Sequence, residues 1–195
     1  MYISHEHKFI FLRFPRVAST TLVEHFALLD SGSGVRIKAG MGYRGNGHIV
    51  PADVMKLFPD EWGKYFKIVF VRNPWDMYVS LYHHLRRRFG VRRFDEFVLF
   101  ARSGTGGLYK YDDYVFDRHS GELLVDFVGR FESLNEDFKK VQAILKTPEF
   151  SISTHKHKTP NRKDYRDYYT SQWMIERIRE FYDAELIAKL GYEFI

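Results

Sequence analysis

The sequence predicts an α/β domain in which helices flank a central parallel sheet. Two segments support this class, because each begins with a short apolar run, passes through a turn that contains proline, and continues with helical spacing of apolar residues. The chain has 195 residues, 45% of them hydrophobic, which is enough to bury one sizeable core. We therefore expect residues 1–195 to form a single domain, with its ligand site at the carboxyl ends of the parallel strands.

The first of these segments covers residues 8–29. Residues 8–14 are apolar and aromatic and end at Pro15, a pattern typical of a buried strand. After a short polar turn, Leu22, Phe26 and Leu29 recur at helical spacing, and the helix should end before the glycine and serine residues that follow.

The second segment covers residues 66–88. Residues 66–71 form a nearly continuous apolar run that ends at Arg72-Asn73-Pro74, and helical spacing follows through residues 77, 81 and 85. Before it, Pro51 opens a short helix at the position where proline is best tolerated. The second segment thus repeats the order of strand, turn and helix.

The remaining segments are less regular. Residues 31–47 contain six glycines and resemble a long loop. Residues 114–131 resemble two strands around a polar turn, and residues 133–145 and 170–190 resemble helices. Between these helices, residues 151–169 are basic and aromatic.

Composition restricts the classes of partner and site. With 30 basic and 25 acidic residues the net charge is +5, which favours an anionic partner, either a nucleotide or a nucleic acid. The chain has no cysteine, so disulfides and thiolate metal sites are excluded. The apolar run near the N-terminus is too short for a signal sequence or a membrane span, so we expect a cytoplasmic, unanchored protein.

The first chemical motif is FPRVASTTL, residues 14–22. A turn between a buried strand and a helix N-terminus presents backbone N–H groups to an anion. The small residues Ala18 and Ser19 allow a phosphate or sulfate close to the backbone, while Arg16, Thr20 and Thr21 add side-chain donors. The alternative is a plain turn that serine and threonine cap.

The second motif is VFVRNPWDMYVSLY, residues 69–82. Arg72 leaves the end of a strand, and Ser80 follows eight residues later, two turns into the helix. An arginine fork together with a hydroxyl suits a phosphate monoester. Alone, however, Arg-Asn-Pro could simply start a helix.

Together the two motifs resemble those of the sulfotransferases that use 3′-phosphoadenosine 5′-phosphosulfate (PAPS), in particular the carbohydrate branch and its short bacterial relatives. The resemblance covers nearly the whole chain in the family's order, continuing through residues 125–138, 155–159, 164–169 and 190–194. It implies a sulfotransferase fold with a P-loop-like phosphosulfate loop. The residues that it assigns to that loop are Arg16, Val17, Ala18, Ser19, Thr20 and Thr21, and Arg72 and Ser80 match the pair that holds the 3′-phosphate.

Two positions in the loop depart from the family's pattern. Arg16 replaces the usual lysine beside the bridging oxygen, keeping the charge in a bulkier planar fork. Ser19 replaces the usual glycine and adds a Cβ where the backbone should approach the ligand closely.

The expected reaction assigns two catalytic roles. Sulfo transfer should pass through a loose transition state with charge building on the bridging oxygen, which Arg16 can neutralise. The acceptor hydroxyl needs a base, and His48 lies where carbohydrate sulfotransferases often place one. Asp53, His155 and His157 remain alternative bases.

Further contacts with the nucleotide are expected from Arg130 and Thr159. Arg130 could instead pair with Glu132 or Asp126 in a structural ion pair. The basic segment 155–166, which contains Thr159, is either a flap over the nucleotide or a cradle for an anionic acceptor, or else a solvated loop.

We therefore expect a sulfotransferase that uses PAPS, releases adenosine 3′,5′-bisphosphate and needs no metal. The resemblance suggests a carbohydrate or small-molecule hydroxyl as acceptor, with no nucleic acid or membrane partner. One alternative is a nucleotide or small-molecule kinase, although the GxxxxGK[ST] string is absent. Another is a non-catalytic module that binds anions or nucleic acid.

Overall fold

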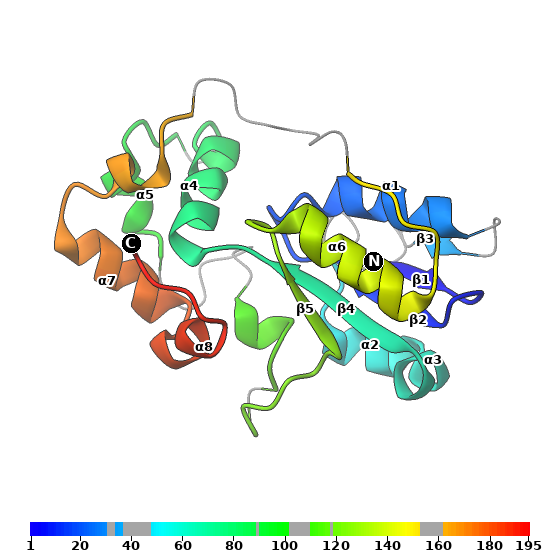
Figure 1. The fold of residues 1–195 in the computed structure, drawn as a ribbon. Helices are drawn as coiled ribbons and strands as arrows, with labels where there is room; N and C mark the ends of the chain where they lie inside the picture. The colour runs from blue at the N-terminus through cyan, green and yellow to red at the C-terminus, as the bar shows by residue number, and fades with distance from the viewer. Residues whose placement is uncertain (31–33, 37–47, 89, 102–109, 118, 153–161) are drawn as a thin grey trace. The chain divides into compact units, whose positions relative to one another are not determined.

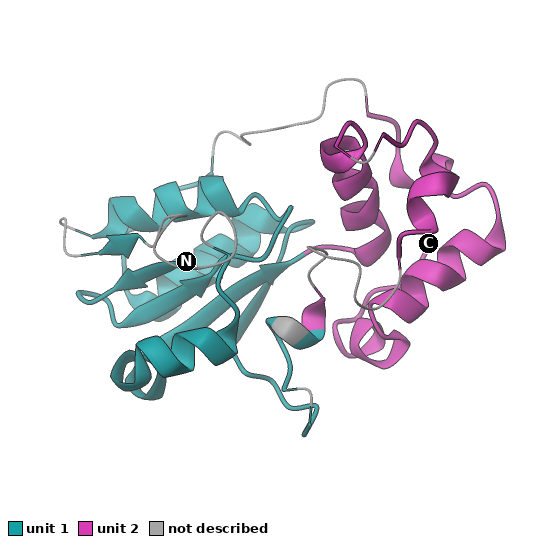
Figure 2. Ribbon diagram, turned by 180° about the vertical axis from the view of Figure 1, so that it is seen from behind, with its two compact units in different colours: residues 1–71, 112–157 teal, residues 72–111, 158–195 magenta. Residues whose placement is uncertain are grey.

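A computed structural model describes the chain except for residues 31–33, 37–47, 89, 102–109, 118 and 153–161 (Figure 1). The chain divides into two compact units. Unit 1 comprises residues 1–71 and 112–157, and unit 2 comprises residues 72–111 and 158–195 (Figure 2).

Unit 1 is built on a five-stranded sheet with the order β3-β1-β2-β4-β5. Strands β2, β4 and β5 run parallel, whereas β1 pairs antiparallel with both β2 and β3. The sheet is therefore mixed: the predicted parallel arrangement is present in β2, β4 and β5, whereas β1 and β3 add an antiparallel edge. A tight turn joins β1 to β2, and strands joined in that way can only pair antiparallel. The strands are β1 (Tyr2–Ser4), β2 (Phe9–Leu12), β3 (Val35–Arg36), β4 (Phe66–Val71) and β5 (Phe127–Arg130).

Helices cover both sides of this sheet. In both views α1 (Ser19–Leu29) lies above the strands, and α2 (Pro51–Leu57) and α3 (Pro59–Lys64) lie below them (Figures 1 and 2). The ring of Phe26 in α1 packs 5.0 Å from Phe9 and 4.8 Å from Phe11 of β2, and 5.2 Å from Phe138 of α6 (Leu134–Leu145). Burying rings of this size contributes about 2 kcal/mol each, so this aromatic cluster fixes α1 and the turn before it against the sheet.

A glycine in β5 makes room for one of these core rings. A Cβ at Gly129 would come within 2.5 Å of the Phe70 ring on β4. Such a contact is far below van der Waals distance, so the position of the Phe70 ring over the neighbouring strand requires glycine here.

Unit 2 is a group of short helices around buried tyrosine and phenylalanine rings. The helices of unit 2 are α4 (Pro74–Leu85), α5 (Phe94–Val98), α7 (Gln172–Phe181) and α8 (Ala184–Lys189), with a 3₁₀ turn η2 (Tyr165–Tyr168). The ring of Tyr78 in α4 lies 5.0 Å from Phe97 of α5 and 6.2 Å from Phe181 of α7, so these rings join the three helices. A further 3₁₀ turn, η1 (Tyr111–Asp113), lies where the chain passes from one unit to the other.

Most of the predicted elements are present. Strand 66–71 is confirmed with its bounds, and the strand near residue 9 and the helices near residues 20, 51, 75 and 133 are confirmed with small shifts. The single helix expected over residues 170–190 is two helices, because Asp183 adopts a left-handed φ of 67° and its side chain caps α8. Of the two strands expected in residues 114–131, only β5 forms, preceded by an isolated bridge between Phe116 and Leu123.

Within the described residues, every helix is too short or too polar to cross a membrane.

Candidate functional site

The turn between β2 and α1 has an unusual backbone. Arg16 and Ala18 both adopt left-handed conformations, with φ of 62° and 57°. For residues other than glycine this costs about 1 kcal/mol each, so packing on either side must hold the turn in place. Ala18 is also the N-cap of α1, and no side chain caps that helix end. Backbone N–H groups from the first turn of α1 and from the preceding left-handed residues lie close together in the chain. Such an arrangement is typical of sites where backbone donors bind an anion.

The side chains of this turn divide into buried and accessible groups. Val17 is fully buried and anchors the turn, and Ser19 and Thr21 are at most 5% exposed. Arg16, Ala18 and Thr20 are partly exposed. The residues that the sequence assigned to the loop thus divide between the turn, which contains Arg16, Val17 and Ala18, and the first turn of α1, which contains the other three. A ligand that arrives from solvent would meet Arg16, Ala18 and Thr20 first.

His48 is held beside this turn as a neutral imidazole. Its Nδ1 lies 2.7 Å from the carbonyl oxygen of Arg13. Because a carbonyl oxygen only accepts, Nδ1 carries the proton and Nε2 carries the lone pair. Burial lowers the pKa of His48 from 6.5 to about 4, and the positive charges of Arg13 and Arg16 act in the same direction against the opposing hydrogen bond. At neutral pH the ring is therefore uncharged.

Arg13 is a functional candidate that the sequence reasoning missed. Its Nη2 donates to Thr20 Oγ1 at 3.2 Å, so Arg13 contacts both the first turn of α1 and His48. Burial and the charge of Arg36 on β3 lower the pKa of the Arg13 guanidinium. In the sequence, the feature that could have indicated Arg13 is its position as a basic residue near the end of an otherwise apolar strand. Its contact with His48, 35 residues away, leaves no trace in the sequence pattern.

The alternative bases divide into one exposed residue and two that lie outside the described part of the chain. Asp53 is exposed in the first turn of α2. His155 and His157 lie outside the described residues, as does Thr159. Of the two candidates that the structure describes, His48 is thus the less exposed one, and it lies beside the turn.

Arg72 and Ser80 belong to unit 2. Arg72 directly follows the last residue of β4 and is 7% exposed, and its Nε donates to Asp76 Oδ2 at 2.6 Å. Asn73 starts α4, since its Oδ1 accepts from the backbone N–H groups of Trp75 and Asp76 at 3.1 and 3.2 Å. The expected helix start is thus present at Asn73, and the Arg72 guanidinium is held separately by a carboxylate. Ser80 lies in α4 and is 3% exposed.

Arg130 ends β5 with an exposed side chain. Its backbone N–H donates to Asp137 Oδ2 at 2.8 Å. One of the partners that the sequence offered for its side chain, Asp126, forms an ion pair with Lys67 at 2.9 Å. As the last residue of β5, which runs parallel to β4, Arg130 lies at the carboxyl edge of the parallel strands.

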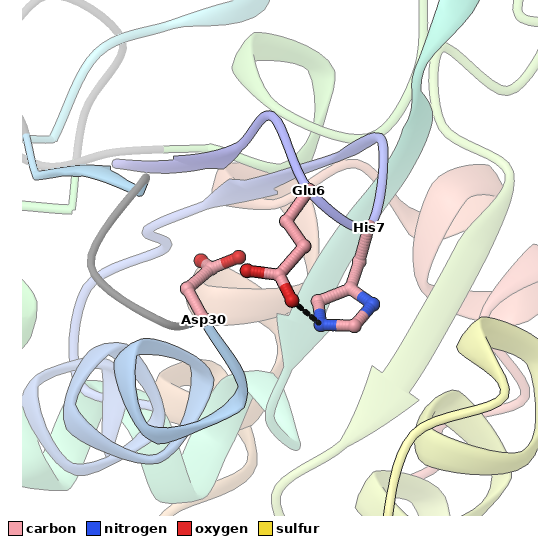
Figure 3. A group of neighbouring side chains, drawn as sticks. All are labelled: Glu6, His7 and Asp30. Carbon is pink, nitrogen blue, oxygen red and sulfur yellow. Dashed lines mark ion pairs between the residues drawn. The ribbon is translucent and has the colours of Figure 1, made fainter.

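One group of potential metal ligands is present among the described residues: Glu6, His7 and Asp30 (Figure 3). Its ligand atoms already make other contacts. His7 Nε2 lies 2.9 Å from the carbonyl oxygen of Leu29, which requires a proton on that nitrogen, and Asp30 accepts from Ser4 Oγ at 2.6 Å and from the Tyr2 hydroxyl. We interpret this group as a set of contacts that fasten the end of α1 to β1.

Comparisons with known proteins show what the chain as a whole is similar to. A family model described as "Sulfotransferase family" matches residues 1–187. A search of curated proteins matches an uncharacterized protein of Archaeoglobus fulgidus, 34% identical over 91 residues, which are 44% of this chain and 71% of the relative. No solved structure gives a significant match.

Proposed function

Because the chain belongs to the sulfotransferase family, we propose that it transfers a sulfo group from PAPS to the hydroxyl of a carbohydrate or small molecule. The observation that carries this proposal is the turn between β2 and α1, where backbone N–H groups and Arg16 lie beside a neutral, partly buried histidine. Such a site can bind an anionic sulfo group and accept a proton from a hydroxyl, which are the two requirements of the reaction.

In this proposal the nucleotide's two phosphate-bearing ends bind to different residues. The backbone and side chains of residues 16–21 bind the 5′-phosphosulfate, supported by the left-handed residues that shape the turn. Arg72 and Ser80 bind the 3′-phosphate, and Arg130 and Thr159 add contacts to the nucleotide. All these groups are cations, hydroxyls and backbone donors, so the proposed site uses no metal.

The chemical step follows from the charges at the turn. The acceptor oxygen forms a bond to sulfur while the bond between sulfur and the bridging oxygen breaks. The acceptor's proton passes to His48 Nε2, and the negative charge left on the phosphate oxygen is stabilised by Arg16. The product nucleotide is adenosine 3′,5′-bisphosphate. Because negative charge develops on the leaving oxygen as its bond to sulfur breaks, Arg16 should contribute more to rate than to substrate binding.

Calorimetry in the presence of EDTA, with a second ATP titration in magnesium without EDTA, tests the nucleotide assignment. We expect adenosine 3′,5′-bisphosphate to bind more tightly than adenosine 5′-phosphate, and ATP to show no gain from added magnesium. Arg72→Ala and Ser80→Ala should each weaken adenosine 3′,5′-bisphosphate by roughly 10- to 100-fold and leave adenosine 5′-phosphate nearly unchanged, because each removes a charge-assisted hydrogen bond. Arg93→Ala, which removes an exposed ion pair with Asp95 in the same unit, is the matched control.

Magnesium-dependent preference for ATP would favour a kinase instead. Binding of single-stranded nucleic acid with steep salt dependence and no preference for the 3′-phosphate would favour a non-catalytic module. Equal losses for both adenosine nucleotides in Arg72→Ala would contradict the assignment of Arg72.

A further inference from the structure

Two arginines in unit 2 share one carboxylate. Arg72 Nε donates to Asp76 Oδ2 at 2.6 Å, and Arg162 Nη2 donates to Asp76 Oδ1 and, at 3.1 Å, to the Asp76 carbonyl oxygen. The partners come from distant parts of the chain, since Arg162 lies 86 residues beyond Asp76. We refer to Arg72, Asp76 and Arg162 as the Asp76 cluster.

The Asp76 cluster is largely shielded from solvent, and its three side chains carry more positive than negative charge. The side chains of Arg72, Asp76 and Arg162 are 9%, 17% and 15% exposed. Two guanidinium groups and one carboxylate sum to one positive charge, and a buried charge is costly unless an anion compensates it. In addition, Arg162 Nε is buried and has no hydrogen-bond partner within the described part of the chain. Arg162 Nε is therefore a donor that an oxygen of a bound anion can satisfy.

The geometry also orients both cations. Arg72 uses Nε on Asp76, so the carboxylate holds one edge of that guanidinium. Arg162 uses Nη2 on the other carboxylate oxygen. A phosphate monoester has several acceptor oxygens and up to two negative charges, and it is the kind of anion that two arginine forks bind together.

We propose that Asp76 is a positioning residue that holds Arg72 and Arg162 as a pair, and that this pair rather than Arg72 alone receives the nucleotide's 3′-phosphate. The inference rests on the proposed function, which assigns that phosphate to Arg72. It adds Arg162 as a second cation and gives the acidic residue four positions after Arg72 a role in binding an anion.

The role of Asp76 can be separated from simple electrostatics by the sign of its effect. If Asp76 acted only through its charge, Asp76→Asn would remove repulsion and tighten the binding of a dianion. If Asp76 positions the arginines, the same substitution weakens that binding, because both guanidinium groups lose the carboxylate that orients them. The two interpretations thus predict opposite changes.

The experiment measures the ratio of the Kd of adenosine 5′-phosphate to that of adenosine 3′,5′-bisphosphate, which we call the 3′-phosphate preference. Asp76→Asn and Arg162→Gln should each lower this preference by roughly 10-fold or more, the loss expected for a charge-assisted hydrogen bond. The Kd of adenosine 5′-phosphate should stay nearly constant. Asp95→Asn, which breaks an exposed ion pair with Arg93 in the same unit, should leave both constants unchanged.

Arg162→Gln keeps the test decisive if Asp76→Asn fails to fold, because it leaves one arginine paired with one carboxylate. An unchanged preference in folded Arg162→Gln, or an unchanged or increased preference in folded Asp76→Asn, overturns the inference. Arg72→Ala serves as the reference: if it lowers the preference while the other two variants do not, the inference fails and the proposed function stands. If Arg72→Ala has no effect on the preference, the proposed 3′-phosphate assignment itself fails.

Discussion

The turn between β2 and α1 and the Asp76 cluster are both suited to an anion, but they are built differently. In the turn, left-handed residues at Arg16 and Ala18 arrange backbone N–H groups beside a helix end that no side chain caps. In the Asp76 cluster, a buried carboxylate holds two guanidinium groups. One region therefore depends on backbone conformation and the other on side-chain charge.

From this difference we expect the turn to act mainly in the chemical step and the Asp76 cluster to act mainly in nucleotide binding. Backbone donors keep their positions during a reaction, which suits a group whose charge changes in the transition state. Paired arginines suit a phosphate whose charge stays constant while the reaction proceeds. Substitutions at the turn should therefore alter turnover, and substitutions in the Asp76 cluster should alter nucleotide affinity.

The largest expected effect comes from the base. His48→Ala should lower turnover by about 10²- to 10⁴-fold, the usual contribution of a positioned base, and leave nucleotide affinity nearly unchanged. Burial holds the pKa of His48 at about 4, so the imidazole is neutral above that pH and is lost as a base when the pH falls through it. The wild-type rate should show this acid limb near pH 4 rather than near pH 6.5, and the variant should lack it.

Asp53→Asn is the matched control for the base, because Asp53 is exposed in α2. It should keep both the rate and the acid limb of the wild-type protein. If the acid limb persisted in His48→Ala, the role would move to Asp53, His155 or His157.

The next largest effect concerns Arg16. Arg16→Ala should lower turnover by roughly 10²- to 10³-fold, the scale for removing one donor that stabilises a developing oxyanion, while product binding weakens much less. Arg16→Lys should keep substantial activity because it retains the charge. An inactive but folded lysine variant, as judged by its melting curve, would mean that the fork geometry and not the charge is required.

The sequence indicated the turn more completely than it indicated the Asp76 cluster. The loop residues 16–21 are contiguous, and a local motif at a strand end can be read from their order. Strand β4 was predicted with its bounds because its apolar run is continuous. His48 was placed by resemblance, and its burial beside Arg13 explains why it is neutral.

The rest depends on contacts between distant residues. The ion pair of Asp76 with Arg162 spans 86 residues and has no local pattern, although Asp76 four residues after Arg72 was a visible signal for half of the cluster. Strands β1 and β3 have three and two residues and exist through pairing of Tyr2 with Phe11 and with Arg36. Segments of that length carry too little periodicity to be predicted as strands.

Phosphorus NMR of bound adenosine 3′,5′-bisphosphate tests most directly whether the two regions serve the two ends of one nucleotide. The ligand carries two phosphates with separate resonances, and each should shift on binding to the wild-type protein. We expect Arg16→Ala to change the bound resonance of the 5′-phosphate and leave that of the 3′-phosphate, and Arg72→Ala to do the reverse. If both variants changed the same resonance, or if neither phosphate responded to its assigned arginine, the division of roles between the turn and the Asp76 cluster would be contradicted.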